Sequence, residues 1–176
     1  MTAIDLEARA IDLLDKYRVG KPPVPVERIA RSEGAQVAFE PFEGELSGML
    51  YRDPNGANVI VVNSLTAKTR QRFTVAHEIG HLLLHAQTLQ VDRPISVRFR
   101  DERSSLAVDL DEIAANQFAA ALLMPRDWVL ADADRLLNRD STLSDEAVVG
   151  ELAERYGVSR QAMEFRLANL GLWTPL

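Results

Sequence analysis

Apolar side chains recur every three or four residues in seven stretches of this chain, which is the spacing of an amphipathic helix. Ser144 and Ser159 stand where helix N-caps are expected, and Gly171 follows the last stretch as a stop signal. Pro125 separates two stretches because the residue before a proline disfavours helical geometry. The predicted helices occupy residues 3–18, 25–34, 64–85, 109–125, 126–137, 145–157 and 160–170.

Three shorter segments are rich in β-branched and aromatic residues, as strands are: AQVAFEPF (35–42), SGMLYRD (47–53) and NVIVVN (58–63). The last two flank Asn55-Gly56, a turn signal that favours a hairpin. We therefore predict a small, mostly antiparallel sheet and an α+β fold. Residues 87–108 lack a sustained helical period and are expected to form a long excursion that includes strand pieces, the kind of connection that is often functional.

Composition narrows the class of protein. The 176 residues suffice for one domain with a real core, and 47% hydrophobic with 26% charged residues is near the average for soluble globular proteins. No signal peptide or membrane-spanning run is apparent, so we expect a cytoplasmic protein. The net charge of −6 opposes general attraction to nucleic acid. Without cysteine, a metal ion must be held by His, Asp or Glu.

All three histidines lie in one stretch, FTVAHEIGHLLLH (73–85). His77 and His81 are four residues apart, so on a helix both can face one ion. Glu78 is turned by about 100° from His77 around the helix axis, which places it beside water at the ion rather than at the ion itself. In this HExxH arrangement the ion activates the water and the carboxylate takes its proton, so the ingredients of peptide hydrolysis are present.

A catalytic metal centre of this kind needs a third protein ligand. His85 lies eight residues beyond the first histidine, about 12 Å along a continuous helix, which is too far to share the ion. The ligand is therefore expected to be an acidic residue of the next helix, with Glu112 as first choice and Asp111, then Asp109, as competitors. Asn116, one turn after Glu112, can accept the spare N–H of a ligating histidine, although a plain exposed amide is an equally good interpretation.

The segments RFTVAHEIGHLLLH and EIAANQFAAALLMP resemble the motifs of the ImmA/IrrE family of zinc metallopeptidases. The resemblance extends to PVPVERIARSEGAQV upstream and LAERYGVSRQAMEFRLANLGL downstream, so it covers most of the chain. It implies a zincin-like metallopeptidase core in which His77, His81 and Glu112 are the zinc ligands and Glu78 is the general base. Members often carry Glu-Ala-Asn where this chain has Ala-Ala-Asn at 114–116, which leaves Glu112 as the only glutamate in this stretch.

The resemblance also implies an activity and a partner. Family members of this size are typically encoded beside a helix-turn-helix (XRE-type) repressor and cleave it, so the expected activity is that of a zinc-dependent endopeptidase acting on such a repressor. Manganese and iron remain alternatives to zinc, because two histidines and a glutamate suit all three ions. The alternative function is that of a non-proteolytic metal-binding regulator or antirepressor that acts by binding its partner protein.

We predict a metallopeptidase core at residues 1–126 and a helical C-terminal region at 127–176. Within the latter, residues 151–170 have the form of a helix-turn-helix, with Gly157 in the turn. DNA binding through this segment is the weaker interpretation because glutamates accompany its arginines and the whole chain is acidic. Packing on the core, or docking of a partner protein, is favoured.

Two smaller alternatives concern the strands. Segment 47–53 or 58–63 can offer a free edge to an extended substrate, although ordinary pairing inside the sheet is favoured for the second because of its apolar run. The hydroxyl of Tyr51 can reach a developing oxyanion, although aromatic packing is the simpler interpretation.

Overall fold

The computed structural model describes residues 2–44, 46–52, 57–84, 89–92 and 102–172, and for residues 89–92 and 102–109 it describes the backbone only. Seven helices lie within these ranges: α1 (Ala3–Lys16), α2 (Val26–Ser32), α3 (Lys68–Leu84), α4 (Glu102–Leu123), α5 (Arg126–Arg139), α6 (Asp145–Tyr156) and α7 (Arg160–Asn169). The strands are β1 (Ala35–Glu40), β2 (Gly48–Arg52), β3 (Asn58–Asn63) and β4 (Leu89–Asp92). None of these helices is long and apolar enough to cross a membrane.

The strands form one sheet in the order β1-β3-β2-β4. β1 pairs with β3 in parallel, whereas β2 is antiparallel to both β3 and β4. The predicted α+β fold and mostly antiparallel sheet are therefore confirmed, and the strand expected within the excursion is β4. Because β2 and β3 each have a neighbour on both sides, the alternative in which one of them offers a free edge is wrong, and the pairing favoured for residues 58–63 is confirmed.

One face of the sheet packs on helices. Leu50, Ile60 and Val62 are buried on this face, which also carries Gly48 against α3. Side chains alternate along a strand, so Tyr51 lies on the opposite face, where it is 43% exposed. The less favoured alternative, in which its hydroxyl reaches the site, therefore receives no support.

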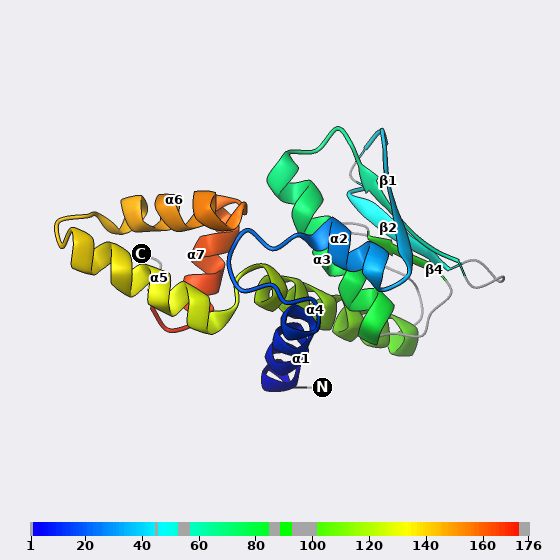
Figure 1. Ribbon diagram of the computed structural model, residues 1–176. Coiled ribbons are helices and arrows are strands. Elements are labelled where there is room, and N and C mark those ends of the chain that lie inside the picture. Colours follow the sequence, from blue (N-terminus) through cyan, green and yellow to red (C-terminus); the bar gives the residue numbers. More distant parts are fainter. Residues whose placement is uncertain (1, 45, 53–56, 85–88, 93–101, 173–176) are drawn as a thin grey trace.

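Helices α3, α4 and α1 follow one another below the sheet (Figure 1). α3 lies against β2 and β3, α4 packs against α3, and α1 packs against α4. Gly80 permits the close approach of α3 and α4, because a Cβ at this position would lie only 3.1 Å from the Cα of Ala115 and 3.3 Å from Cδ1 of Phe118. The core of these layers consists of buried apolar side chains, among them Leu6, Leu13, Val75, Ile79, Phe118 and Leu122.

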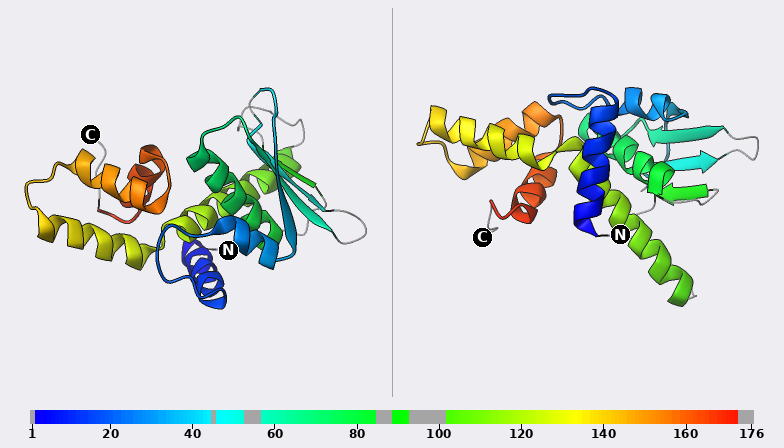
Figure 2. Two further views of the ribbon diagram at one scale, coloured as in Figure 1. Left: turned by 45° about the horizontal axis from the view of Figure 1, so that its top comes forward. Right: turned by 60° about the horizontal axis from the view of Figure 1, so that its bottom comes forward.

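Helices α5, α6 and α7 lie together to one side of the sheet (Figures 1 and 2). Their attachment is specific: Arg166 of α7 donates a hydrogen bond to the carbonyl of Met124 and forms an ion pair with Glu7 of α1. Arg72 of α3 donates to the carbonyl of Gly157, between α6 and α7. The helix-turn-helix-like segment thus packs on the rest of the molecule. The division of the chain at residue 126 stays a prediction.

Helix boundaries depart from the predictions in two places. α3 begins at Lys68 rather than near Ser64, because the hydroxyl of Thr66 donates to the carbonyl of Asn63 in a preceding turn. α4 begins at Glu102 and so includes residues predicted to be irregular. Its first turns were not predicted to be helical because Ser104 and Ser105 are weak helix formers. The turn signal at 55–56 lies outside the described residues.

The predicted caps at the C-terminal helices are confirmed. Ser144 Oγ accepts a hydrogen bond from the backbone N–H of Ala147, and Ser159 Oγ accepts one from Ala162. Gly157 and Gly171 have φ of 64° and 73°, the left-handed conformation that ends a helix.

Candidate metal centre

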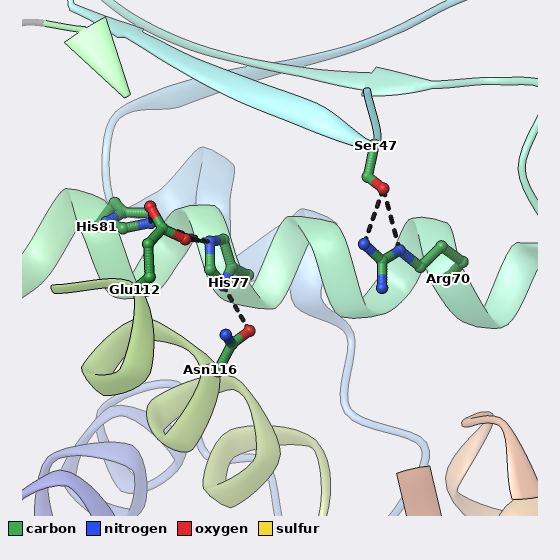
Figure 3. Close-up of polar contacts among 6 residues, drawn as sticks. All are labelled: Ser47, Arg70, His77, His81, Glu112 and Asn116. Carbon is green, nitrogen blue, oxygen red and sulfur yellow. Dashed lines mark hydrogen bonds and ion pairs between the residues drawn. The ribbon is translucent and has the colours of Figure 1, made fainter. Parts of the chain in front are cut away.

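Two helices supply the candidate site. His77 and His81 stand one turn apart on one face of α3, and Glu112 and Asn116 stand one turn apart on the facing side of α4 (Figure 3). His77 contacts Asn116, and His81 contacts Glu112, so α3 and α4 run antiparallel past each other. Gly80 and the small side chains between the helices let the helices approach closely, so that these polar groups contact one another.

The three predicted metal ligands converge on one point. Nε2 of His77 lies 2.9 Å from Nε2 of His81. The Glu112 carboxylate reaches both rings, with Oε2 3.2 Å from Nε2 of His77 and Oε1 3.3 Å from Nε2 of His81. Within the described residues this is the one group of three or more His, Asp or Glu side chains that could hold a metal ion.

Asn116 determines which nitrogen of His77 faces this point. Its Oδ1 lies 3.0 Å from Nδ1 of His77, and an amide oxygen can only accept a hydrogen bond. Nδ1 therefore carries a proton, which leaves Nε2 as the nitrogen that faces Glu112 and His81 and that would ligate a bound metal ion. The ligand atoms of the three side chains lie within 4.8 Å of one another. Two imidazole nitrogens and one carboxylate are a donor set that suits zinc, so these residues fit a divalent cation.

The site is largely buried, and its carboxyl group is ionised. The side chains of His77 and His81 are 3% and 1% exposed, and that of Glu112 is 20% exposed. Burial alone would raise the pKa of the Glu112 carboxyl, but interactions with the two imidazoles outweigh burial and hold this pKa well below its ordinary value. Glu112 is therefore ionised at neutral pH, as a metal ligand must be.

Glu78 lies on the side of α3 that faces the sheet and is fully buried. Gly48, at the start of β2, allows α3 to approach the sheet beside Glu78. A Cβ at Gly48 would collide with the methyl group of Thr74 and lie 2.9 Å from the carbonyl oxygen of Val61, and it would be in ordinary contact, at 3.7 Å, with Oε1 of Glu78. A glycine inside a strand pattern signals such a close approach, so Gly48 was detectable from the sequence.

Two arginine contacts near the site were not predicted. Arg52 of β2 donates to the carbonyls of His81 and Leu82 near the C-terminal end of α3, where a positive charge is favourable. Arg70, two turns before His77, donates through Nε and Nη2 to Oγ of Ser47, as Figure 3 shows. No local spacing rule connects these residues, because each pair joins the sheet region to a helix distant in sequence.

The structure separates the competing third ligands only in part. Glu112 lies with the histidines, and Asp111 is not part of the group. The side chain of Asp109 and the whole of His85 lie outside the described residues. Asn116 occupies the place expected of a partner for a ligating histidine.

Several known proteins are similar to this chain. An uncharacterized immunity region protein of Bacillus phage phi105 is 30% identical over 144 residues, which are 82% of this chain and 81% of that protein. The radiation response metalloprotease IrrE of Deinococcus deserti is 32% identical over 164 residues, or 93% of this chain and 53% of that protein. IrrE of Deinococcus radiodurans is 36% identical over 159 residues, or 89% and 40%. The chain thus spans about half or less of each IrrE protein.

A solved structure described as a Mycobacterium tuberculosis transcriptional regulator shares the fold, with a TM-score of 0.58 at 18% identity over 93% of this chain and 46% of that one. The model of the IrrE N-terminal-like domain, a peptidase family, matches residues 30–168. Since this match covers most of the chain, including His77, His81 and Glu112, the protein belongs to the ImmA/IrrE family of metallopeptidases.

Proposed function

We propose that this protein is a zinc-dependent endopeptidase. The observation that carries the proposal is the convergence of His77, His81 and Glu112 on one point, with the buried carboxylate of Glu78 on the adjoining side of α3. When bound at such a site, zinc activates water near neutral pH and polarises a carbonyl group. Manganese and iron suit the same ligands and remain the alternatives.

Each residue has a separate role in this proposal. The two imidazoles and the Glu112 carboxylate hold the ion, and Asn116 keeps the proton of His77 on Nδ1. Glu78 accepts the proton of the attacking water and delivers it to the leaving amine.

The proposed substrate is a helix-turn-helix repressor encoded beside the gene. The support is the family membership, together with relatives whose names refer to an immunity region and to a radiation response metalloprotease. The alternative, a non-proteolytic metal-binding regulator on the same scaffold, uses the same ligands but has no need of Glu78.

The two functions are distinguished by co-expressing the chain with that repressor. A protease is expected to produce one discrete cut in the repressor that disappears with a chelator and in Glu78→Gln, while Glu78→Gln keeps its metal and its melting temperature. Glu112→Ala should lose both metal and cleavage. If Glu78→Gln still inactivates the repressor, the protein acts by binding and the proposed protease function is wrong.

DNA binding through residues 151–170 receives no support from the contacts of α7. Arg166, an arginine of this segment, is 8% exposed and is held by Glu7 and the Met124 carbonyl. Met163 and Leu167 are also buried on the face of α7 that packs inward.

A further inference from the structure

Strand β2 and helix α3 contact each other, and their contacts follow in the same order along both elements. Ser47, the residue before β2, accepts hydrogen bonds from Nε and Nη2 of Arg70, near the start of α3. One turn further along the helix, Thr74 lies so close to Gly48 that a Cβ at Gly48 would collide with its methyl group. Figure 3 shows the Ser47–Arg70 contact and His81 at opposite ends of the drawn part of α3.

Arg52, the last residue of β2, contacts the turn of α3 that carries a predicted metal ligand. Its Nη2 donates to the carbonyl of His81 at 2.9 Å and to that of Leu82 at 3.1 Å. α3 ends at Leu84, and the carbonyls in the last turn of a helix lose intrahelical donors because no further turn follows. Arg52 therefore supplies hydrogen bonds to the part of α3 that the helix itself stabilises least.

The lengths of strand and helix between the two end contacts match. The five residues from Ser47 to Arg52 span about 17 Å on a strand, and the eleven residues from Arg70 to His81 span about the same length on a helix. A slip of α3 by one turn, about 5.4 Å, would break both contacts. β2 itself is fixed because it pairs with β3 on one side and with β4 on the other. The strand therefore sets the position of the last turn of α3.

The position of this turn decides whether His81 meets its partners. Nε2 of His81 lies 3.3 Å from Oε1 of Glu112, which belongs to α4, and 2.9 Å from Nε2 of His77. A metal site tolerates deviations of only about 0.2 Å in its ligand distances. A small displacement of the last turn of α3 is therefore enough to spoil the site, even when the rest of the helix stays in place.

We propose that Arg52 is a positioning residue for the metal centre: by donating to the carbonyls of His81 and Leu82, it holds the imidazole of His81 where it converges with His77 and Glu112. The proposal rests on the metal binding included in the function proposed above. It does not depend on proteolysis or on the identity of the substrate.

The charge of Arg52 predicts an effect of the opposite sign. A guanidinium group repels a nearby divalent cation, so if Arg52 acted through its charge alone, its removal would strengthen zinc binding. Positioning predicts that removal weakens zinc binding. The sign of the change therefore distinguishes the two explanations.

The test measures zinc affinity of the full-length protein by competition with a chromophoric chelator. Arg52→Met should weaken zinc binding about tenfold, the lower end of the range for groups that orient metal ligands. Arg52→Lys should lie between Arg52→Met and the unsubstituted protein, because an ammonium group keeps the charge and a donor but lacks the planar geometry of a guanidinium. If Arg52→Met does not fold, the comparison of Arg52→Lys with the unsubstituted protein decides, and equal affinity would overturn the proposal.

Bound Co²⁺ gives a second readout, because its visible absorption depends on the arrangement of the ligands around the ion. Arg52→Met should alter this spectrum. Arg166→Met is the matched control: Arg166 also donates to a carbonyl beyond the end of a helix, that of Met124, but about three turns along α4 from Glu112. It should lower the stability of the metal-free protein and leave the zinc affinity and the Co²⁺ spectrum unaltered.

Unchanged or tighter zinc binding in Arg52→Met would overturn the positioning role, and so would an equal loss of affinity in Arg166→Met. These outcomes differ from failure of the protease function. Zinc binding that depends on Arg52 in a protein that cuts no repressor would leave the positioning role without the protease. A repressor that is cut by a protein whose zinc affinity does not depend on Arg52 would leave the protease without this role. Absence of zinc binding by the unsubstituted protein would overturn both.

Discussion

Gly80 separates α3 from α4 beside the metal centre, and the substitution Gly80→Ala places one methyl group in that contact. The new Cβ would lie 3.1 Å from Cα and 3.3 Å from the carbonyl oxygen of Ala115, and 3.3 Å from Cδ1 of Phe118. Two of these three atoms belong to helix backbone and the third to a fully buried ring, so none can rotate away. The helices must therefore move apart.

The size of the movement follows from these contacts. Carbon atoms pack at roughly 3.5–4.0 Å, so α4 must move by about 0.3–0.5 Å relative to α3. Glu112 and Asn116 move with α4, whereas a metal site tolerates deviations of only about 0.2 Å in its ligand distances. We expect Gly80→Ala to weaken zinc binding by at least about tenfold, or about 1.4 kcal/mol.

The stability of the metal-free protein should change much less. Replacing glycine by alanine inside a helix stabilises the fold by about 1 kcal/mol, whereas overpacking destabilises it by about 1–3 kcal/mol. The free energy of unfolding should therefore fall by at most about 2 kcal/mol. Zinc affinity is measured by competition with a chromophoric chelator, and stability by urea unfolding of the metal-free protein. The two measurements separate distortion of the site from general loss of structure.

Gly150→Ala is the matched control. It is also a helical glycine, in α6, but its Cβ would meet the guanidinium end of Arg160, which is exposed and can move away. This change should leave zinc affinity unaltered. If Gly80→Ala bound zinc as tightly as the unsubstituted protein, close helix approach would not be what holds Glu112 and Asn116 in position, and the reasoning above would be refuted.

Two other substitutions test the contacts around the site. Asn116→Ala removes the acceptor for Nδ1 of His77 and should weaken zinc binding about 10–100-fold in the same titration. Asn116→Asp keeps an acceptor and should bind zinc at least as well as the alanine variant does. Unchanged zinc affinity in Asn116→Ala would count against the role of Asn116 as partner of His77. Arg166→Met removes a buried ion pair and a hydrogen bond to Met124, so urea unfolding should show that the free energy of unfolding falls by about 2–4 kcal/mol. Arg166→Lys should recover only part of this stability, because lysine cannot form two parallel hydrogen bonds with a carboxylate. A loss no larger than that of an exposed arginine would show that α7 is held by other contacts.

The parts of the site that could be predicted are those encoded within one helix. Glu78 directly follows His77, and His81 stands four positions after His77. The helical repeat alone therefore decides which of these residues share a face. Glu112 was a weaker prediction, because the pattern around 109–116 places the α4 helix but not its rotation or its register against α3. The geometry favours Glu112 over Asp111 through the register of that packing, which no local rule contains.

The position of α7 was beyond sequence analysis for a different physical reason. It depends on Arg166 meeting Glu7, 159 residues away, and on Arg72 meeting the carbonyls around Gly157. The periodicity of residues 160–170 predicted a helix with an apolar face, and its arginines and glutamates were equally consistent with DNA, a partner protein or the core. Only the tertiary contacts decide which face is covered.

The register of α3 against α4 sets the geometry of the candidate metal centre. Passing along the pair, His81 lies opposite Glu112, and His77 lies opposite Asn116. Because both histidines stand on one helix and both of their partners on the other, a displacement between the helices changes the two contacts together. A change that separates the helices, as at Gly80, should therefore weaken metal binding, whereas a change at the contacts of α7, such as Arg166→Met, should lower stability and leave the two contacts unaltered.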